Sequence, residues 1–306
     1  MKLLPKFLGG MVGSALGDAI GELAFRYPEK ERLSTHVAEV DTLVYTDDTA
    51  MAIALAESLI AIGDIDAKHL GDCFRVHFER EPWRGYGPGP PAIFARVVND
   101  SISYEEAARE LYGGAGSLGN GAAMRIVPLG LLFHASNGLY SKAETTASVT
   151  HAHALGIDGA AIQARAIALA TAQPAGTDLD AGAFVRTLAG GSRTATMRQK
   201  LEQVGELSAH KAAPETATHR LGLSVAVHES MPFALYCFLR HPRDYRECIY
   251  CAILHGGDRD TMGAMAGALS GAFLGIDTIP VQWRDKLENG ARIEQLAREL
   301  AAVAGR

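Results

Sequence analysis

Apolar residues recur along most of this chain with the three-to-four-residue spacing of an α-helix. We find no convincing pair of strands, no tandem repeat and no linker, so the pattern predicts a single compact all-α domain of about a dozen helices over residues 1–306. The predicted helices between the two ends of the chain are Ala50–Ile62, Ala67–Arg80, Ala92–Asn99, Tyr104–Leu111, Gly121–His134, Ser141–His153, Ile157–Ala172, Leu179–Leu188, Thr194–Ala209, Met231–Leu239, Tyr245–Leu254 and Trp283–Val303.

Two further predicted helices carry glycine at every fourth position. Lys6–Leu23 has glycines at 9, 13, 17 and 21, and Asp258–Gly275 has them at 263, 267, 271 and 275. Each glycine costs a helix about 1 kcal/mol relative to alanine, so this spacing needs a reason. It places the glycines on one face of each helix, where a second helix can approach closely. The two helices either pack against each other at the centre of the fold or each pack against some other helix.

Threonine and aspartate cluster at the start of two apolar helices. Y-T-D-D-T at 45–49 precedes one helix, and H-G-G-D-R-D-T at 255–261 opens the other. Each cluster alone is also explained as a helix cap, because Asp at a helix start is common. If the clusters converge, four carboxylates repel one another and must take up protons or bind a cation. Such oxygen ligands suit Mg²⁺ or Mn²⁺ rather than Zn²⁺, and four carboxylates are enough for two ions.

Two glycine-rich breaks also suggest function. They are R-G-Y-G-P-G-P-P at 84–91 and G-G-A-G-S-L-G-N-G at 113–121, the second of which leads directly into a predicted helix. A glycine-rich loop before a helix start can bind an anion through backbone N–H groups, although many such loops are simple turns. A single histidine such as His151 is, by itself, more often structural than a ligand.

Composition narrows the classes of partner. The chain is 48% hydrophobic and 21% charged. Its net charge is −6 and the sequence contains no run of Lys and Arg residues, so we expect no direct binding to nucleic acid. Pro5 and Lys6 interrupt the apolar N-terminus, which argues against a signal peptide, and no run reaches the ~20 apolar residues of a membrane span. The four cysteines form no disulfide framework, and Cys248 and Cys251 suit the core. We expect a cytoplasmic monomer without a membrane partner.

Taken together, the motifs resemble the ADP-ribosylglycohydrolase family over almost the whole chain. The stretch H-E-S-M-P-F-A-L-Y-C-F-L-R at 228–240 is most similar to the ADP-ribosylhydrolase-3-like branch, which acts on serine-linked ADP-ribose, poly(ADP-ribose) and O-acetyl-ADP-ribose. The resemblance implies an all-α hydrolase that removes ADP-ribose from O-linked protein or small-molecule substrates. The other motifs that carry it are G-D-A-I-G at 17–21, Y-T-D-D-T-A-M-A at 45–52, R-G-Y-G at 84–87, G-S-L-G-N-G-A-A-M-R at 116–125, T-H at 150–151 and G-G-D-R-D-T at 256–261.

The resemblance also implies a set of site residues. Two Mg²⁺ ions, or Mn²⁺ in their place, would hold the ribose hydroxyls and a water that attacks the anomeric carbon, with Asp47 and Asp48 as catalytic residues. The metal ligands by matching position are Thr46, Asp47, Asp48, Asp258, Asp260 and Thr261. The diphosphate would bind backbone N–H groups of the glycine-rich loop, with Tyr112 near adenine and Gly85 beside the ribose. The substrate-binding residues are Gly85, Tyr86, Tyr112, Ser117, Gly119, Asn120, Gly121 and His151.

Two positions depart from the family pattern. Relatives usually carry a glutamate where this chain has Phe25, and the nearest acid is Glu22. Glu22 is therefore a candidate acid/base residue, with a solvated residue at a helix end as the alternative. Leu118 replaces an aromatic residue that often stacks on adenine. These departures leave two alternatives to hydrolysis of O-linked substrates, namely hydrolysis of ADP-ribosylarginine and a non-catalytic ADP-ribose-binding or structural relative.

Overall fold

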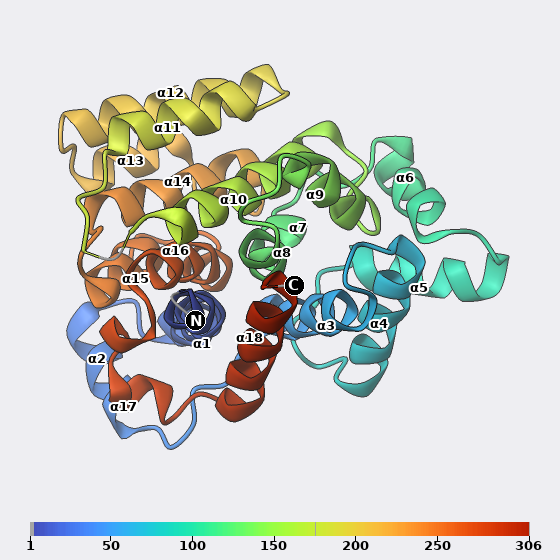
Figure 1. Cartoon of the computed structure of the whole chain (residues 1–306), viewed down its shortest axis with the longest axis horizontal. Helices are drawn as coiled ribbons and strands as arrows, with labels where there is room; N and C mark the ends of the chain where they lie inside the picture. The colour runs from blue at the N-terminus through green and yellow to red at the C-terminus, as the bar shows by residue number, and fades with distance from the viewer. Residues whose placement is uncertain (1–2, 175, 306) are drawn as a thin grey trace.

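The computed structural model describes residues 3–174 and 176–305 and confirms the all-α prediction (Figure 1). Within these residues, extended pairing is limited to two isolated bridges, Leu43 with Leu287 and Gly119 with Ala226. The helices are α1 (Leu4–Arg26), α2 (Lys30–Glu39), α3 (Asp47–Ile62), α4 (Ala67–Arg80), α5 (Gly89–Asp100), α6 (Tyr104–Gly114), α7 (Gly121–Met124), α8 (Val127–Leu132), α9 (Leu139–Ser148), α10 (Ala154–Ala172), α11 (Ala181–Gly191), α12 (Ala195–Ala209), α13 (Pro214–Leu221), α14 (Val227–Arg240), α15 (Tyr245–Ile253), α16 (Arg259–Leu274), the 3₁₀ helix η1 (Ile276–Thr278), α17 (Val281–Arg284) and α18 (Gly290–Ala304).

The described residues contain more helices than predicted, for two reasons. The predicted helix Gly121–His134 is two short helices, α7 and α8, because Pro128 in the first turn of α8 has no N–H to continue the earlier hydrogen-bond ladder. The predicted helix Trp283–Val303 is likewise interrupted before α18, where Asn289 takes a left-handed conformation. Two short amphipathic helices, α2 and α13, were not predicted.

Helices α1 and α16 pack against each other along their glycine faces, which confirms the first of the two arrangements (Figure 1). Glycines 9, 13 and 17 of α1 face glycines 271, 267 and 263 of α16, so the helices are antiparallel. A Cβ atom at Gly17 would lie only 2.0 Å from the carbonyl oxygen of Gly263, and one at Gly9 only 2.2 Å from that of Gly271. The repeated glycine therefore allows backbone-to-backbone contact at the centre of the fold.

This contact positions the start of α16 beside α1. A Cβ at Gly21 would lie 2.6 Å from the Cα of Asp260, so the acidic N-terminus of α16 is held close to that part of α1. On the other side, Asp18 of α1 is bonded to the first turn of α3. Helix α10 is buried along most of its length, as its apolar sequence predicted. No described helix is both long and apolar enough to cross a membrane.

Candidate active site

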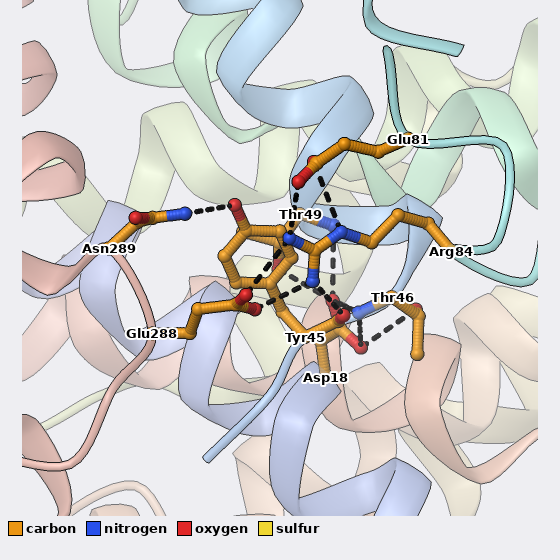
Figure 2. A network of polar contacts seen from close by, with 8 residues as sticks. All are labelled: Asp18, Tyr45, Thr46, Thr49, Glu81, Arg84, Glu288 and Asn289. Atoms are coloured by element: carbon orange, nitrogen blue, oxygen red, sulfur yellow. Dashed lines mark hydrogen bonds and ion pairs between the residues drawn. The ribbon is translucent and has the colours of Figure 1, made fainter. Parts of the chain in front are cut away.

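Asp18 anchors the start of α3 (Figure 2). Its carboxylate, which is fully buried, accepts hydrogen bonds from the Thr46 hydroxyl at 2.8 Å and the Thr49 hydroxyl at 2.6 Å. It also accepts the backbone N–H groups of both threonines at 3.1 Å. Thr46 occupies the N-cap position, but its hydroxyl donates to Asp18 and does not cap the helix. A helix start that the sequence presented as a simple cap is thus held by an acid from another helix.

Arg84 holds the same segment from the opposite side (Figure 2). Its buried guanidinium donates to the carboxylates of Glu81 and Glu288 and to the carbonyl of Tyr45, and it lies 4.2 Å over the Tyr45 ring. The Arg84 carbonyl in turn accepts the N–H of Asp47 at 2.8 Å. The R-G-Y-G loop is therefore hydrogen-bonded to the backbone of Asp47, the first residue of α3.

The two Thr/Asp clusters meet at one cavity. The Thr261 hydroxyl lies 3.4 Å from Asp48 Oδ2, although the two residues are 213 positions apart in sequence. The Thr46 hydroxyl lies 3.2 Å from the same oxygen. The cavity has a volume of about 270 Å³. The members of both clusters that line it are Asp47, Asp48, Asp258, Asp260 and Thr261.

Burial and mutual repulsion favour the protonated forms of Asp47, Asp48 and Asp260. Burial, followed by the charge of Asp18, raises the pKa of Asp47 to about 7. Burial and the charge of Asp258 raise the pKa of Asp260 to about 8. Burial, followed by the charges of Asp18 and its neighbours, raises the pKa of Asp48 well above its usual value. A bound cation would reverse this balance by stabilising the ionised carboxylates.

The donor set fits a hard divalent cation. Asp48 Oδ1 is buried and has no hydrogen-bond partner among the described residues, which is costly unless the atom binds something else. Carboxylate and hydroxyl oxygens are the donors that Mg²⁺ and Mn²⁺ prefer. In residues 3–174 and 176–305, no three His, Cys, Asp or Glu side chains already stand in a metal-binding arrangement. The six-residue ligand set, which includes two threonines, therefore stays a prediction.

The glycine-rich loop forms another wall of the cavity, with Ser117, Gly119, Asn120 and Gly121 among its lining residues. Two details differ from expectation. The Gly119 N–H donates to the Ser117 hydroxyl oxygen at 3.2 Å. The Asn120 N–H donates to the carbonyl of Val225 at 2.9 Å, as part of the isolated bridge beside it, so it is not free for a diphosphate. The Asn120 side chain instead donates to Asp258 Oδ2 at 2.6 Å. Asn120 therefore connects the loop to the second acidic cluster.

Gly85 and Tyr112 also line the cavity. Gly85 has a φ of +89°, a conformation that favours glycine, and a Cβ there would lie 3.9 Å from Asp47 Oδ1. Tyr112 is 62% exposed and takes a left-handed conformation at a kink in α6, which presents its ring at the cavity. Both residues therefore lie where a ligand in the cavity could contact them.

The cavity lining does not include three predicted site residues, namely Thr46, Tyr86 and Glu22. Tyr86 packs edge-on against Phe78, with ring centroids 5.1 Å apart, and is not among the lining residues. Glu22 is exposed on α1 and is also not among them. Phe25, which stands at the position of the family glutamate, is 51% exposed. Neither Glu22 nor Phe25 is therefore placed in the cavity wall.

Three cavity-associated residues were missed as site residues. Asp18 was visible as an acid inside a glycine- and alanine-rich helix, and Arg125 as a lone charge in an apolar run. Thr150 directly precedes the predicted His151. Buried polar residues need partners, so a charged residue inside an apolar pattern was the signal that could have identified Asp18 and Arg125.

Comparison with known proteins agrees with the geometry. A sequence model of the ADP-ribosylglycohydrolase family matches residues 1–306. ADP-ribosylhydrolase ARH3 of Homo sapiens is 32% identical, over 98% of this chain and 94% of that protein, and ADP-ribosylhydrolase ARH3 of Mus musculus is 31% identical, over 98% and 92%. A solved structure described as an ADP-ribosylglycohydrolase-related protein complex matches with a TM-score of 0.74 at 25% identity, covering 99% of both chains.

Proposed function

This chain belongs to the ADP-ribosylglycohydrolase family, and we propose that it releases ADP-ribose from O-linked substrates in a reaction that depends on two Mg²⁺ ions. Family membership identifies the chain as a glycosyl hydrolase and decides against the non-catalytic alternative. The observation that carries the proposed mechanism is the meeting of two acidic clusters at one cavity. Similarity to ADP-ribosylhydrolase ARH3 supports an ADP-ribosylated protein or small molecule as substrate.

The cavity can bind both parts of such a substrate. The acidic wall would hold the cations through Thr46, Asp47, Asp48, Asp258, Asp260 and Thr261, and Mn²⁺ would suit the same oxygen ligands. When bound, these ions would supply an activated water and orient the ribose hydroxyls. The wall with the glycine-rich loop would face the diphosphate, and Tyr112 would contact the adenine.

Asp48 is our candidate for the base. Its Oδ2 lies near the hydroxyls of Thr46 and Thr261, whereas its Oδ1 has no partner among the described residues. In the proposed reaction the Asp48 carboxylate takes a proton from the attacking water as the water oxygen bonds to the anomeric carbon. The bond from that carbon to the leaving oxygen breaks through an oxocarbenium-like state, and the leaving oxygen takes up the proton from Asp48. The exposed position of Glu22, outside the cavity lining, supports a minor role for that residue.

A panel of linkages tests the proposal. Purified protein would be given serine-linked, arginine-linked and O-acetyl ADP-ribose, each with Mg²⁺ or with EDTA, and released ADP-ribose would be measured. We expect release from the serine-linked and O-acetyl substrates with Mg²⁺ and loss of release in EDTA. Release from the arginine-linked substrate alone would refute the O-linked assignment. Full activity in EDTA would refute the metal requirement.

A further inference from the structure

Three buried side chains form a hydrogen-bonded row in the cavity wall. Within the described residues, none of the three forms an ion pair with an acidic residue. Arg125 Nη2 donates to the hydroxyl oxygen of Thr150 at 2.6 Å, and the same oxygen lies 2.8 Å from His151 Nδ1. All three residues line the cavity, and none is more than 6% exposed. The row therefore leads from a buried cation to an imidazole at the cavity.

Arg125 is placed to act on Thr150. Its guanidinium is fully buried and lies 4.4 Å over the ring of Phe74, and Nη1 is 3.7 Å from the sulfur of Met51. Its only recorded oxygen partner among the described residues is the Thr150 hydroxyl. A guanidinium donates hydrogen bonds and never accepts them, so Thr150 Oγ1 must accept in this contact.

This contact limits where the other protons lie. The Thr150 hydroxyl proton points away from the Arg125 donor, and within the described residues His151 Nδ1 is the acceptor in reach, so the proton points at Nδ1. Nδ1 then accepts, and a neutral imidazole whose Nδ1 accepts carries its proton on Nε2. Burial, followed by the charge of Arg125, lowers the pKa of His151 to about 3, which is in keeping with a neutral ring.

The protonated nitrogen faces the glycine-rich loop. His151 Nε2 lies 3.7 Å from the position of a Cβ at Gly119 and 3.1 Å from that of a Cβ at Gly121. No hydrogen-bond partner for Nε2 is recorded within the described part of the chain. We infer that Arg125 and Thr150 are positioning residues that fix the proton of His151 on Nε2, so that His151 donates to a diphosphate oxygen of the substrate. The diphosphate rests on the proposed function, whereas the proton position does not.

The proton position can be measured without substrate. Nitrogen-15 NMR of imidazole-labelled protein distinguishes the two neutral tautomers, and the His151→Gln spectrum identifies the His151 signals. We expect the wild-type spectrum to show the proton on Nε2. A proton on Nδ1 would overturn the inference, even if the protein hydrolysed every substrate in the panel. Failure of the hydrolase assay would leave this measurement unaffected.

Matched variants test the two positioning residues. Thr150→Ser keeps the hydroxyl and should keep the Nε2 tautomer, whereas Thr150→Val removes it and should give a mixture of tautomers. Arg125→Lys keeps a donor for Thr150. Arg125→Met lets the hydroxyl proton point away from His151 and should admit the other tautomer. Calorimetry should show ADP-ribose binding about 10-fold weaker in folded Thr150→Val than in Thr150→Ser. Unchanged tautomer and affinity in Thr150→Val would refute the role of Thr150, and the Ser and Lys variants keep the test available if the others fail to fold.

Discussion

The acidic cavity gives the metal-free protein an unusual dependence on pH. The unfolded chain releases its aspartate protons near pH 4, whereas burial and repulsion raise the pKa of Asp47 to about 7 and that of Asp260 to about 8. Between these limits the folded protein binds more protons than the unfolded chain. The free energy of unfolding contributed by these acids therefore falls as the pH rises from about 4 to about 8. Bound Mg²⁺ would replace the protons and remove this loss.

The expected size follows from a single proton. If Asp260 keeps its proton in the folded state from about pH 5.5 to about pH 8, the loss is about 3 kcal/mol, at about 1.4 kcal/mol per pH unit. We count one proton only, because protonating one carboxyl reduces the repulsion on its neighbours. A chain of this length changes its melting temperature by about 2 °C per kcal/mol. Mg²⁺ should therefore raise the melting temperature by about 6 °C more at pH 8.5 than at about pH 5.5.

Thermal unfolding followed by circular dichroism would measure this difference, in EDTA and in millimolar Mg²⁺ at both pH values. Asp260→Asn should reduce the dependence of the Mg²⁺ effect on pH. Asp158→Asn is the control, because Asp158 is a fully buried acid that accepts its hydrogen bonds from Tyr140, Ser192 and Thr194 outside the cavity. That control should lower stability overall and leave the Mg²⁺ effect intact. An Mg²⁺ effect of the same size at both pH values, or none at either, would refute the reasoning.

Three further predictions concern the base, the loop and the helix contact. In steady-state kinetics, Asp48→Ala should abolish turnover, whereas Glu22→Gln should lower kcat less than ~10-fold. That loss is below the ~10²–10⁴-fold usual for an acid–base group. Equal losses in the two variants would contradict this prediction. By calorimetry, Gly119→Glu should weaken ADP-ribose binding through repulsion of the diphosphate, with Gly119→Ala near wild type because a Cβ there meets no atom closer than 3.3 Å. In thermal unfolding, Gly17→Ala should destabilise the fold by about 3 kcal/mol. Gly190→Ala should not, because a Cβ at Gly190 would meet no packed atom of the described residues within 4 Å. Equal melting temperatures of the two variants would argue against the close helix contact.

The sequence predicted features that depend on local periodicity. The helical spacing identified the long helices, and the glycine spacing predicted a close helix contact on each glycine face, because only residues without side chains allow that approach. It did not decide which helix makes the contact. The acidic helix starts were also recognised, since both clusters stand in short runs of sequence. Each of these features can be read from neighbouring residues without knowledge of their partners.

Features that depend on distant partners could not be read in this way. The sequence did not show that Val225 would take the N–H of Asn120, or that Phe78 would pack against the ring of Tyr86. It also did not show that Asp18, inside the glycine-rich helix, would bind the start of α3. Motif similarity placed residues in the site by position alone, whereas hydrogen bonding and packing decide which of their atoms are available.

The helix contact and the acidic cavity depend on each other physically. Repelling carboxylates could be relieved if the elements that carry them moved apart. Here α16 is held to α1 by direct backbone contact along the glycines, and α3 is held to α1 by the buried hydrogen bonds of Asp18. Separating these helices would break close packing and leave buried donors without partners. We therefore expect the repulsion to be relieved by protons at low pH and by a cation at high pH, while the helices keep their positions.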